Sequence, residues 1–237
     1  LSGQGGALQV SDVEDSLSPD NEHFLRTTML CLENTHNRWG GRIQPHEHVK
    51  DLCDWAHENG LSTHLDGARL WNAASASKTS PQSLCEPFDS VSVCFSKGLG
   101  APIGSALVGS KAFIAEARRA RKLFGGGMRQ AGVLGAAALY ALKYQQQRIA
   151  EDHYHANEIG KACAKSTSLS VRENRIDTNI ILCDVAPEYG TANQLIEHLS
   201  KNGLECLATG KQSIRMVTHL DVNTEQIDQA CAILSSL

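Results

Sequence analysis

Apolar and polar positions alternate along the first 150 residues with two different periods. Compact apolar runs predict strands, and stretches with apolar residues three or four positions apart predict helices. The predicted strands lie at residues 27–32, 61–65, 90–95 and 105–108, and the predicted helices at residues 10–17, 45–59, 70–76, 111–122 and 129–155. Strands that alternate with helices favour an α/β fold with a largely parallel sheet.

Two of these helices carry end signals. The helix at residues 10–17 is expected to have Ser11 as its N-cap and Glu14 in the capping-box position. The helix at residues 45–59 is expected to bury one face and to end at Gly60. That face consists of Val49, Leu52, Cys53 and Ala56.

The pattern changes after residue 150. Apolar runs and amphipathic stretches there predict a smaller α+β domain. They lie at residues 178–183, 192–202, 213–217 and 224–237. We therefore predict two domains: residues 1–150, as the C-terminal part of a larger domain, and residues 151–237.

Composition narrows the class of protein. The 237 residues are 41% hydrophobic and 20% charged, as in an ordinary globular protein. A net charge of −4 and no long basic stripe argue against binding to nucleic acid. No apolar run is long enough to span a membrane, and no signal peptide is visible. The eight cysteines form no C-x-x-C pair, which predicts reduced thiols and a cytoplasmic location.

Two chemical groups stand at strand ends. Asp66 ends one predicted strand, and Lys97 follows another. In an open α/β sheet both would face the crevice outside the strand ends, where ligands bind. A lysine there can form a Schiff base with pyridoxal phosphate, and a carboxylate can keep the pyridine nitrogen protonated. Each residue alone has an ordinary alternative: Asp66 as a cap of the following helix, and Lys97 as a solvated lysine. A lysine after a buried strand is unusual, because burial disfavours its charged form.

Other polar groups leave alternatives open. Arg215 lies within an apolar strand and needs an anionic partner, either a substrate carboxylate or an internal salt bridge. The glycines at residues 125–127, which precede Arg129, form either an anion-binding turn or a simple bend between helices. His46 and His48 would point apart on a helix, so no metal site is predicted. The absence of a Gly-x-Ser-x-Gly elbow argues against a hydrolase.

Five motifs in this order resemble those of the low-specificity L-threonine aldolases. They are LENTHN at residues 32–37, HLDGAR at 64–69, SKGLGAPIGS at 96–105, RKLFGGGMRQAG at 121–132 and RMVTHLDV at 215–222. The resemblance implies the type I fold of pyridoxal-phosphate enzymes, that of the aspartate aminotransferase superfamily. It implies that residues 1–150 belong to the large cofactor-binding domain and that the enzyme is a homodimer or homotetramer.

The resemblance also implies residue roles. Lys97 would carry the cofactor, Asp66 would pair with its pyridine nitrogen, and Arg69 would lie near its phenolic oxygen and the substrate carboxylate. Arg215 would clamp that carboxylate, and His23 would lie near the substrate hydroxyl. Lys122 and Arg129 are weaker assignments to the site or to a subunit contact.

The implied reaction is retro-aldol cleavage of L-threonine or L-allo-threonine to glycine and acetaldehyde, with His23 as a candidate base. The family carries a further N-terminal segment with the phosphate-binding loop and a histidine that stacks on the cofactor. The sequence is therefore expected to be N-terminally truncated. Two alternatives stay open: a catalytically inactive truncated product or pseudoenzyme, and another lyase of the same fold, such as a β-eliminating enzyme.

Overall fold

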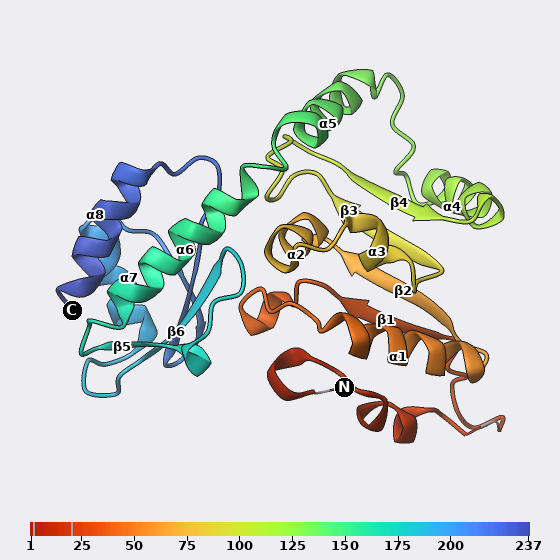
Figure 1. Ribbon diagram of the computed structural model, residues 1–237, viewed down its shortest axis with the longest axis horizontal. Helices are drawn as coiled ribbons and strands as arrows, with labels where there is room; N and C mark the ends of the chain where they lie inside the picture. Colours follow the sequence, from red (N-terminus) through yellow and green to blue (C-terminus); the bar gives the residue numbers. More distant parts are fainter. Residues whose placement is uncertain (2, 20) are drawn as a thin grey trace. The chain divides into compact units, whose positions relative to one another are not determined.

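The computed structural model describes residues 1, 3–19 and 21–237. The chain forms two compact units; Figure 1 colours the chain from red at the N-terminus to blue at the C-terminus. The first contains residues 1–35 and 43–147, and the second contains residues 36–42 and 148–237. The domain boundary at residue 150 stays a prediction, and the sequence pattern gives no sign that residues 36–42 belong to the second unit.

A four-stranded sheet with the order β1-β2-β3-β4 organises the first unit. The strands are β1 (Met29–Glu33), β2 (Ser62–Gly67), β3 (Ser90–Cys94) and β4 (Ser105–Gly109). Strands β1, β2 and β3 are parallel, and β4 pairs with β3 in the antiparallel direction. The predicted strands are present, and the sheet is mixed but mostly parallel.

Three helices cover one face of this sheet: α1 (His46–Glu58), α2 (Leu70–Ser77) and α3 (Pro81–Cys85) (Figure 1). All four residues of the predicted apolar face of α1 are buried. Gly60 follows the helix with a φ of 70°, a left-handed conformation that glycine adopts without strain. Side chains alternate along β2, so Thr63 and Leu65 are buried under the helices while Ser62 and Asp66 are exposed.

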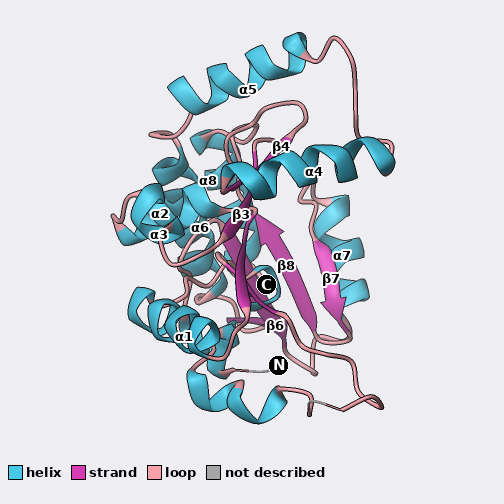
Figure 2. Ribbon diagram, turned by 90° about the vertical axis from the view of Figure 1, so that its right-hand side faces the viewer, coloured by secondary structure: helices cyan, strands magenta, loops and turns pink. Residues whose placement is uncertain are grey.

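Helices α4 (Lys111–Leu123) and α5 (Gly132–Tyr144) follow β4, and a long loop joins them (Figure 2). The prediction of one helix over residues 129–155 is wrong, because α5 ends at Tyr144 and α6 (Ile149–Cys163) begins five residues later. The break lies where the chain passes from one unit to the other. From Ile149 onward, the helix buries its side chains in the core of the second unit.

The prediction of a helix over residues 10–17 is also wrong. This segment forms two 3₁₀ turns, Val10–Asp12 and Glu14–Ser16. The capping pair is Gln9 with Asp12, whose carboxylate accepts the Gln9 backbone N–H at 2.8 Å. So short a segment gains too few helical hydrogen bonds to offset the cost of nucleating a helix.

An antiparallel sheet with the order β5-β6-β8-β7 organises the second unit. Its strands are β5 (Leu169–Val171), β6 (Ile180–Val185), β7 (Leu207–Gly210) and β8 (Ser213–Val217). Helices α6, α7 (Ala192–Lys201) and α8 (Thr224–Ser235) pack against it. The core includes Ile181, Cys183, Leu195, Leu199 and Ile214. This unit has the α+β character that the sequence predicts.

Further 3₁₀ turns lie at Gln4–Gly6, Asn37–Trp39 and Arg172–Asn174. All eight cysteines are free thiols. Among the described residues, no helix combines the length and the apolar character needed to cross a bilayer.

Candidate functional site

The carboxyl edge of the first sheet brings Asp66 and Lys97 onto neighbouring strands. Asp66 lies near the end of β2 and pairs in register with Glu33 of β1 and Ser92 of β3. Lys97 follows the last residue of β3 by three positions. Because β2 and β3 are parallel, both side chains belong to the same edge of the sheet. This is the edge at which α/β proteins bind ligands.

The Asp66 carboxylate is exposed and oriented by a local contact. Its Oδ1 accepts a hydrogen bond from the Ala68 backbone N–H at 3.0 Å. Helix α2 begins at Leu70 with Arg69 as its N-cap, and no side chain caps it. Asp66 therefore does not serve as the helix cap that its sequence position allows.

A short turn holds Lys97. The Gly100 N–H donates to the Lys97 carbonyl at 2.8 Å, and the Ala101 N–H donates to the Phe95 carbonyl at 2.9 Å. Leu99 is fully buried and anchors the turn, while the Lys97 side chain is exposed. Within the described part of the chain, the Lys97 amine has no hydrogen-bond or ion-pair partner. Its position after an apolar strand predicts a buried side chain, but the Lys97 side chain is not buried.

Arg69 adds a half-buried cation beside Asp66. Burial lowers the pKa of its guanidinium, and the nearby carboxylates of Glu33 and Asp66 oppose this shift. At neutral pH the guanidinium therefore remains a cation between two anions. Asp66, Arg69 and Lys97 together place one carboxylate and two cationic groups along one edge of the sheet.

Close packing of β2 on β3 supports this edge. A Cβ atom at Gly67 would lie 2.8 Å from the Ser92 backbone carbonyl oxygen. We expect Gly67→Ala to lower the free energy of unfolding by about 1–3 kcal/mol, because the two strands must shift apart. Chemical denaturation of the wild type, of Gly67→Ala and of a control variant would measure this change in the free energy of unfolding. Gly210→Ala in strand β7 would meet only the Ser213 Cβ at 3.7 Å, an ordinary contact, and serves as the control. Equal stability of the two variants would contradict the packing argument.

The structure does not connect His23 with this edge of the sheet. It precedes β1, on the chain that enters the sheet at the amino end of that strand, whereas Asp66 and Lys97 lie at carboxyl ends. Its side chain is 80% exposed, and its ring lies 3.7 Å from the Glu22 carboxylate. Among the described residues, no hydrogen bond or ion pair joins His23 to Asp66 or Lys97. The structure does not bring the predicted base together with the predicted lysine.

A polar cavity of about 480 Å³ lies within the second unit. It is lined by Asn37, Arg38, Arg172, Leu182, Thr209 and Arg215. Arg215 is half-buried on β8, and its Nη2 donates to Asn37 Oδ1 at 3.1 Å. Arg172 pairs with the Asp184 carboxylate and also donates to the Ser213 hydroxyl at 2.9 Å. The cavity is thus rich in guanidinium groups and suits an anionic ligand.

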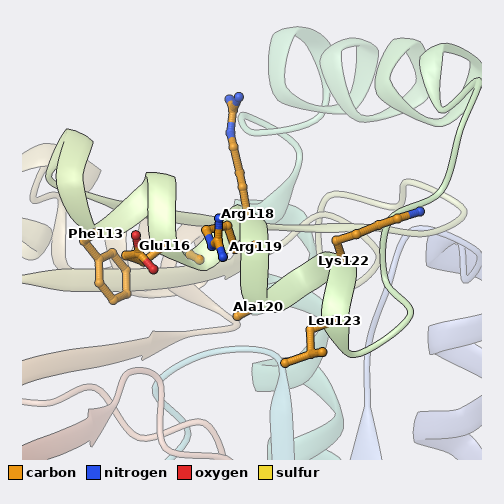
Figure 3. Close-up of a pocket in the computed structure, with 8 residues that line it drawn as sticks. Phe113, Glu116, Arg118, Arg119, Ala120, Lys122 and Leu123 are labelled. Atoms are coloured by element: carbon orange, nitrogen blue, oxygen red, sulfur yellow. The ribbon is translucent and has the colours of Figure 1, made fainter.

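The motif LENTHN ends at Asn37 and does not include Arg38, and no pattern marks either residue as lining a cavity. Their place in the cavity depends on packing against strands nearly 180 positions further along the chain. The pair Gly40-Gly41 is the one local signal, because two successive glycines favour a tight turn. Lys122 and Arg129 are exposed, and Lys122 extends from α4 (Figure 3).

Comparison with known proteins decides the family. The model of the beta-eliminating lyase family matches residues 1–186. The chain belongs to this family. Over 227 residues it is 40% identical to the low specificity L-threonine aldolase of Escherichia coli O157:H7. This alignment covers 96% of this chain and 65% of that protein. Over 229 residues it is 37% identical to low-specificity L-threonine aldolase 1 of Arabidopsis thaliana, covering 94% of this chain and 63% of that one.

Solved structures confirm the predicted fold. The Leishmania major threonine aldolase superposes with a TM-score of 0.78 at 18% identity, over 98% of this chain and 68% of that chain. The Rhodiola rosea 4-hydroxyphenylacetaldehyde synthase superposes with a TM-score of 0.73 at 17% identity, over 98% and 54%. The chain therefore has the fold of these two enzymes. The chain spans 65% of the length of the Escherichia coli relative.

Members of this family use pyridoxal phosphate, and the residues present fit this cofactor. An accessible amine, Lys97, suits the cofactor aldehyde, and an accessible carboxylate on the next strand, Asp66, suits its pyridine nitrogen. The chemistry of this donor set is that of a Schiff-base site.

Proposed function

We propose that the protein is a pyridoxal-phosphate-dependent aldolase that cleaves L-threonine or L-allo-threonine to glycine and acetaldehyde. The observation that supports this most is the placement of Lys97 and Asp66 at the carboxyl ends of adjacent parallel strands. The 40% identity to a low specificity L-threonine aldolase supports the substrate class. Its physiological role would be threonine catabolism with formation of glycine, in the cytoplasm.

Each residue has a part in this proposal. Lys97 holds the cofactor covalently, and Asp66 keeps a proton on its pyridine nitrogen. The cofactor would supply an electron sink for cleavage of the substrate Cα–Cβ bond. Arg215 binds the substrate carboxylate, and Arg69 supports the negative charges near the cofactor and that carboxylate. The chain supplies positioning and charge, which is where a protein contributes to such a reaction.

The proton on the substrate hydroxyl needs an acceptor. The assignment of His23 to this role rests on the resemblance alone. In the structure its ring lies beside the Glu22 carboxylate and its side chain is 80% exposed, so the geometry adds no support. Imidazole is suited to such a transfer near neutral pH.

A second candidate is β-elimination, which the name of the matched family favours. The two reactions release different products from L-threonine. Retro-aldol cleavage gives glycine and acetaldehyde, whereas β-elimination gives ammonia and 2-oxobutanoate. We expect glycine and acetaldehyde in equal amounts when the chain is incubated with pyridoxal phosphate and L-threonine or L-allo-threonine. Ammonia and 2-oxobutanoate instead would establish the lyase, and no product despite bound cofactor would establish an inactive protein.

The surface of α4 and α5 supports assembly into a homodimer or homotetramer. Helix α5 is apolar on all sides, yet only Ala141 is buried, and Leu139 is 67% exposed. On α4, Phe113, Ala120 and Leu123 lie along one side, while Arg118 points away from it (Figure 3). Apolar patches of this kind mark contacts with another polypeptide. We therefore include both helices in the proposed subunit interface.

A further inference from the structure

The segment of residues 36–42 is locked against the second unit although it precedes α1 in the chain. The His36 N–H donates to the Arg42 carbonyl at 2.8 Å, and the Gly41 N–H donates to the His36 carbonyl at 2.9 Å. These two bonds close the segment into a loop. We call residues 36–42 the arginine clip.

Contacts with residues 173–178, which precede β6 in the chain, hold the clip. The Thr178 hydroxyl donates to the Gly41 carbonyl at 2.9 Å. Gly41 has a φ of 70°, and a Cβ atom there would lie 2.2 Å from the Thr178 Oγ1, so only glycine fits. Arg42 forms ion pairs with Glu173 and, at 3.7 Å, with Asp177. The clip is therefore a fixed part of the second unit.

The fixed clip places Asn37 against Arg215. The Asn37 Oδ1 accepts the Arg215 Nη2–H at 3.1 Å, and both residues line the cavity of about 480 Å³. An arginine side chain has many rotamers, and an acceptor that fixes its guanidinium before a ligand arrives lowers the entropy cost of binding. An amide acceptor does this without adding a negative charge beside the guanidinium.

We propose that Asn37 is a positioning residue for Arg215 and that the arginine clip sets the affinity of the second unit for the substrate carboxylate. This inference rests on the proposed function, in which Arg215 binds that carboxylate. A neutral, fixed acceptor at position 37 is the feature that matters. An aspartate of the same size would form an ion pair with Arg215 and compete with the substrate.

The test is the dissociation constant of glycine, measured by isothermal titration calorimetry on the full chain with pyridoxal phosphate. Loss of a hydrogen bond to a charged group predicts that Asn37→Ala weakens glycine binding about 10-fold. Asn37→Asp should weaken it more, by about 100-fold, because the ion pair must be broken for each binding event. In both variants the cofactor absorbance and the melting temperature should stay unchanged. Asn157→Ala, at an exposed position of α6, is the control and should bind as the wild type does.

Combination with Arg215→Ala separates the two proposals. If Asn37 acts through Arg215, Asn37→Ala has no further effect once Arg215 is alanine. An equal additional loss in that background would overturn the inference. Normal glycine binding by Asn37→Asp, which is isosteric and needs no repacking, would overturn it as well. If Arg215→Ala binds glycine as well as the wild type does, the carboxylate clamp of the proposed function fails, and the positioning role fails with it.

Discussion

Replacing Lys97 with alanine is expected to remove the visible absorbance of lysine-bound pyridoxal phosphate and to lower turnover by at least about 1,000-fold. The amine is the one atom of this residue that the proposed chemistry uses. Leu99 and the turn hydrogen bonds from Gly100 and Ala101 hold the backbone in place without the Lys97 side chain. Since the side chain is exposed, the free energy of unfolding should change by no more than about 0.5 kcal/mol.

Absorbance titration with pyridoxal phosphate and acetaldehyde release from L-threonine measure the two effects together. Lys97→Arg keeps the positive charge but cannot form the Schiff base, so it should behave as Lys97→Ala does. Lys50→Ala, on the exposed face of α1, is the matched control and should retain both signals. A band of normal intensity in Lys97→Ala would show that a different lysine carries the cofactor.

Local patterns predicted the elements that are stabilised by their own amphipathic faces. Residues 45–59 show four apolar positions on one helical face, and all four are buried in α1. The apolar run around Arg215 forms β8, and the alternation of strands and helices gives the mostly parallel sheet. In each case a short stretch of sequence both forms the element and determines which side is buried.

Features that depend on distant packing could not be predicted. The contact between Asn37 and Arg215 joins residues 178 positions apart, and no periodicity in either segment indicates it. The break between α5 and α6 follows from the change of unit at residue 148 and has no proline or glycine to mark it. The exposure of Lys97 depends on what covers the edge of the sheet, which the apolar strand before it does not reveal.

The residues of the candidate site could be found from the sequence because strand ends are local features. Asp66 and Lys97 each follow an apolar run, and parallel pairing of those runs is enough to place them at one edge. What the pattern leaves open is the role of each group. Only the hydrogen bonds of Asp66 distinguish a helix cap from a free carboxylate, and these bonds give the second large prediction.

Replacing Asp66 with asparagine should leave the cofactor attached but slow turnover by about 1,000-fold, a loss of about 4 kcal/mol at 1.36 kcal/mol per factor of ten. The change is isosteric, and an asparagine oxygen can still accept the Ala68 N–H that now bonds Asp66 at 3.0 Å. The local backbone should therefore be unchanged, and Lys97 should still give its absorbance band. An amide cannot hold a proton on the pyridine nitrogen, so the ring withdraws electrons less strongly as the Cα–Cβ bond breaks.

The contrast between the two variants is what tests the assignment. Lys97→Ala should lose both the band and the activity, whereas Asp66→Asn should lose the activity alone. Asp66→Glu restores a negative charge at a longer reach and should recover part of the turnover. Asp54→Asn, on the exposed face of α1, should have no effect. If Asp66→Asn kept more than a third of wild-type turnover, the carboxylate would have no catalytic part. Its contact with Ala68 would then make Asp66 a residue of the turn before α2 and nothing more.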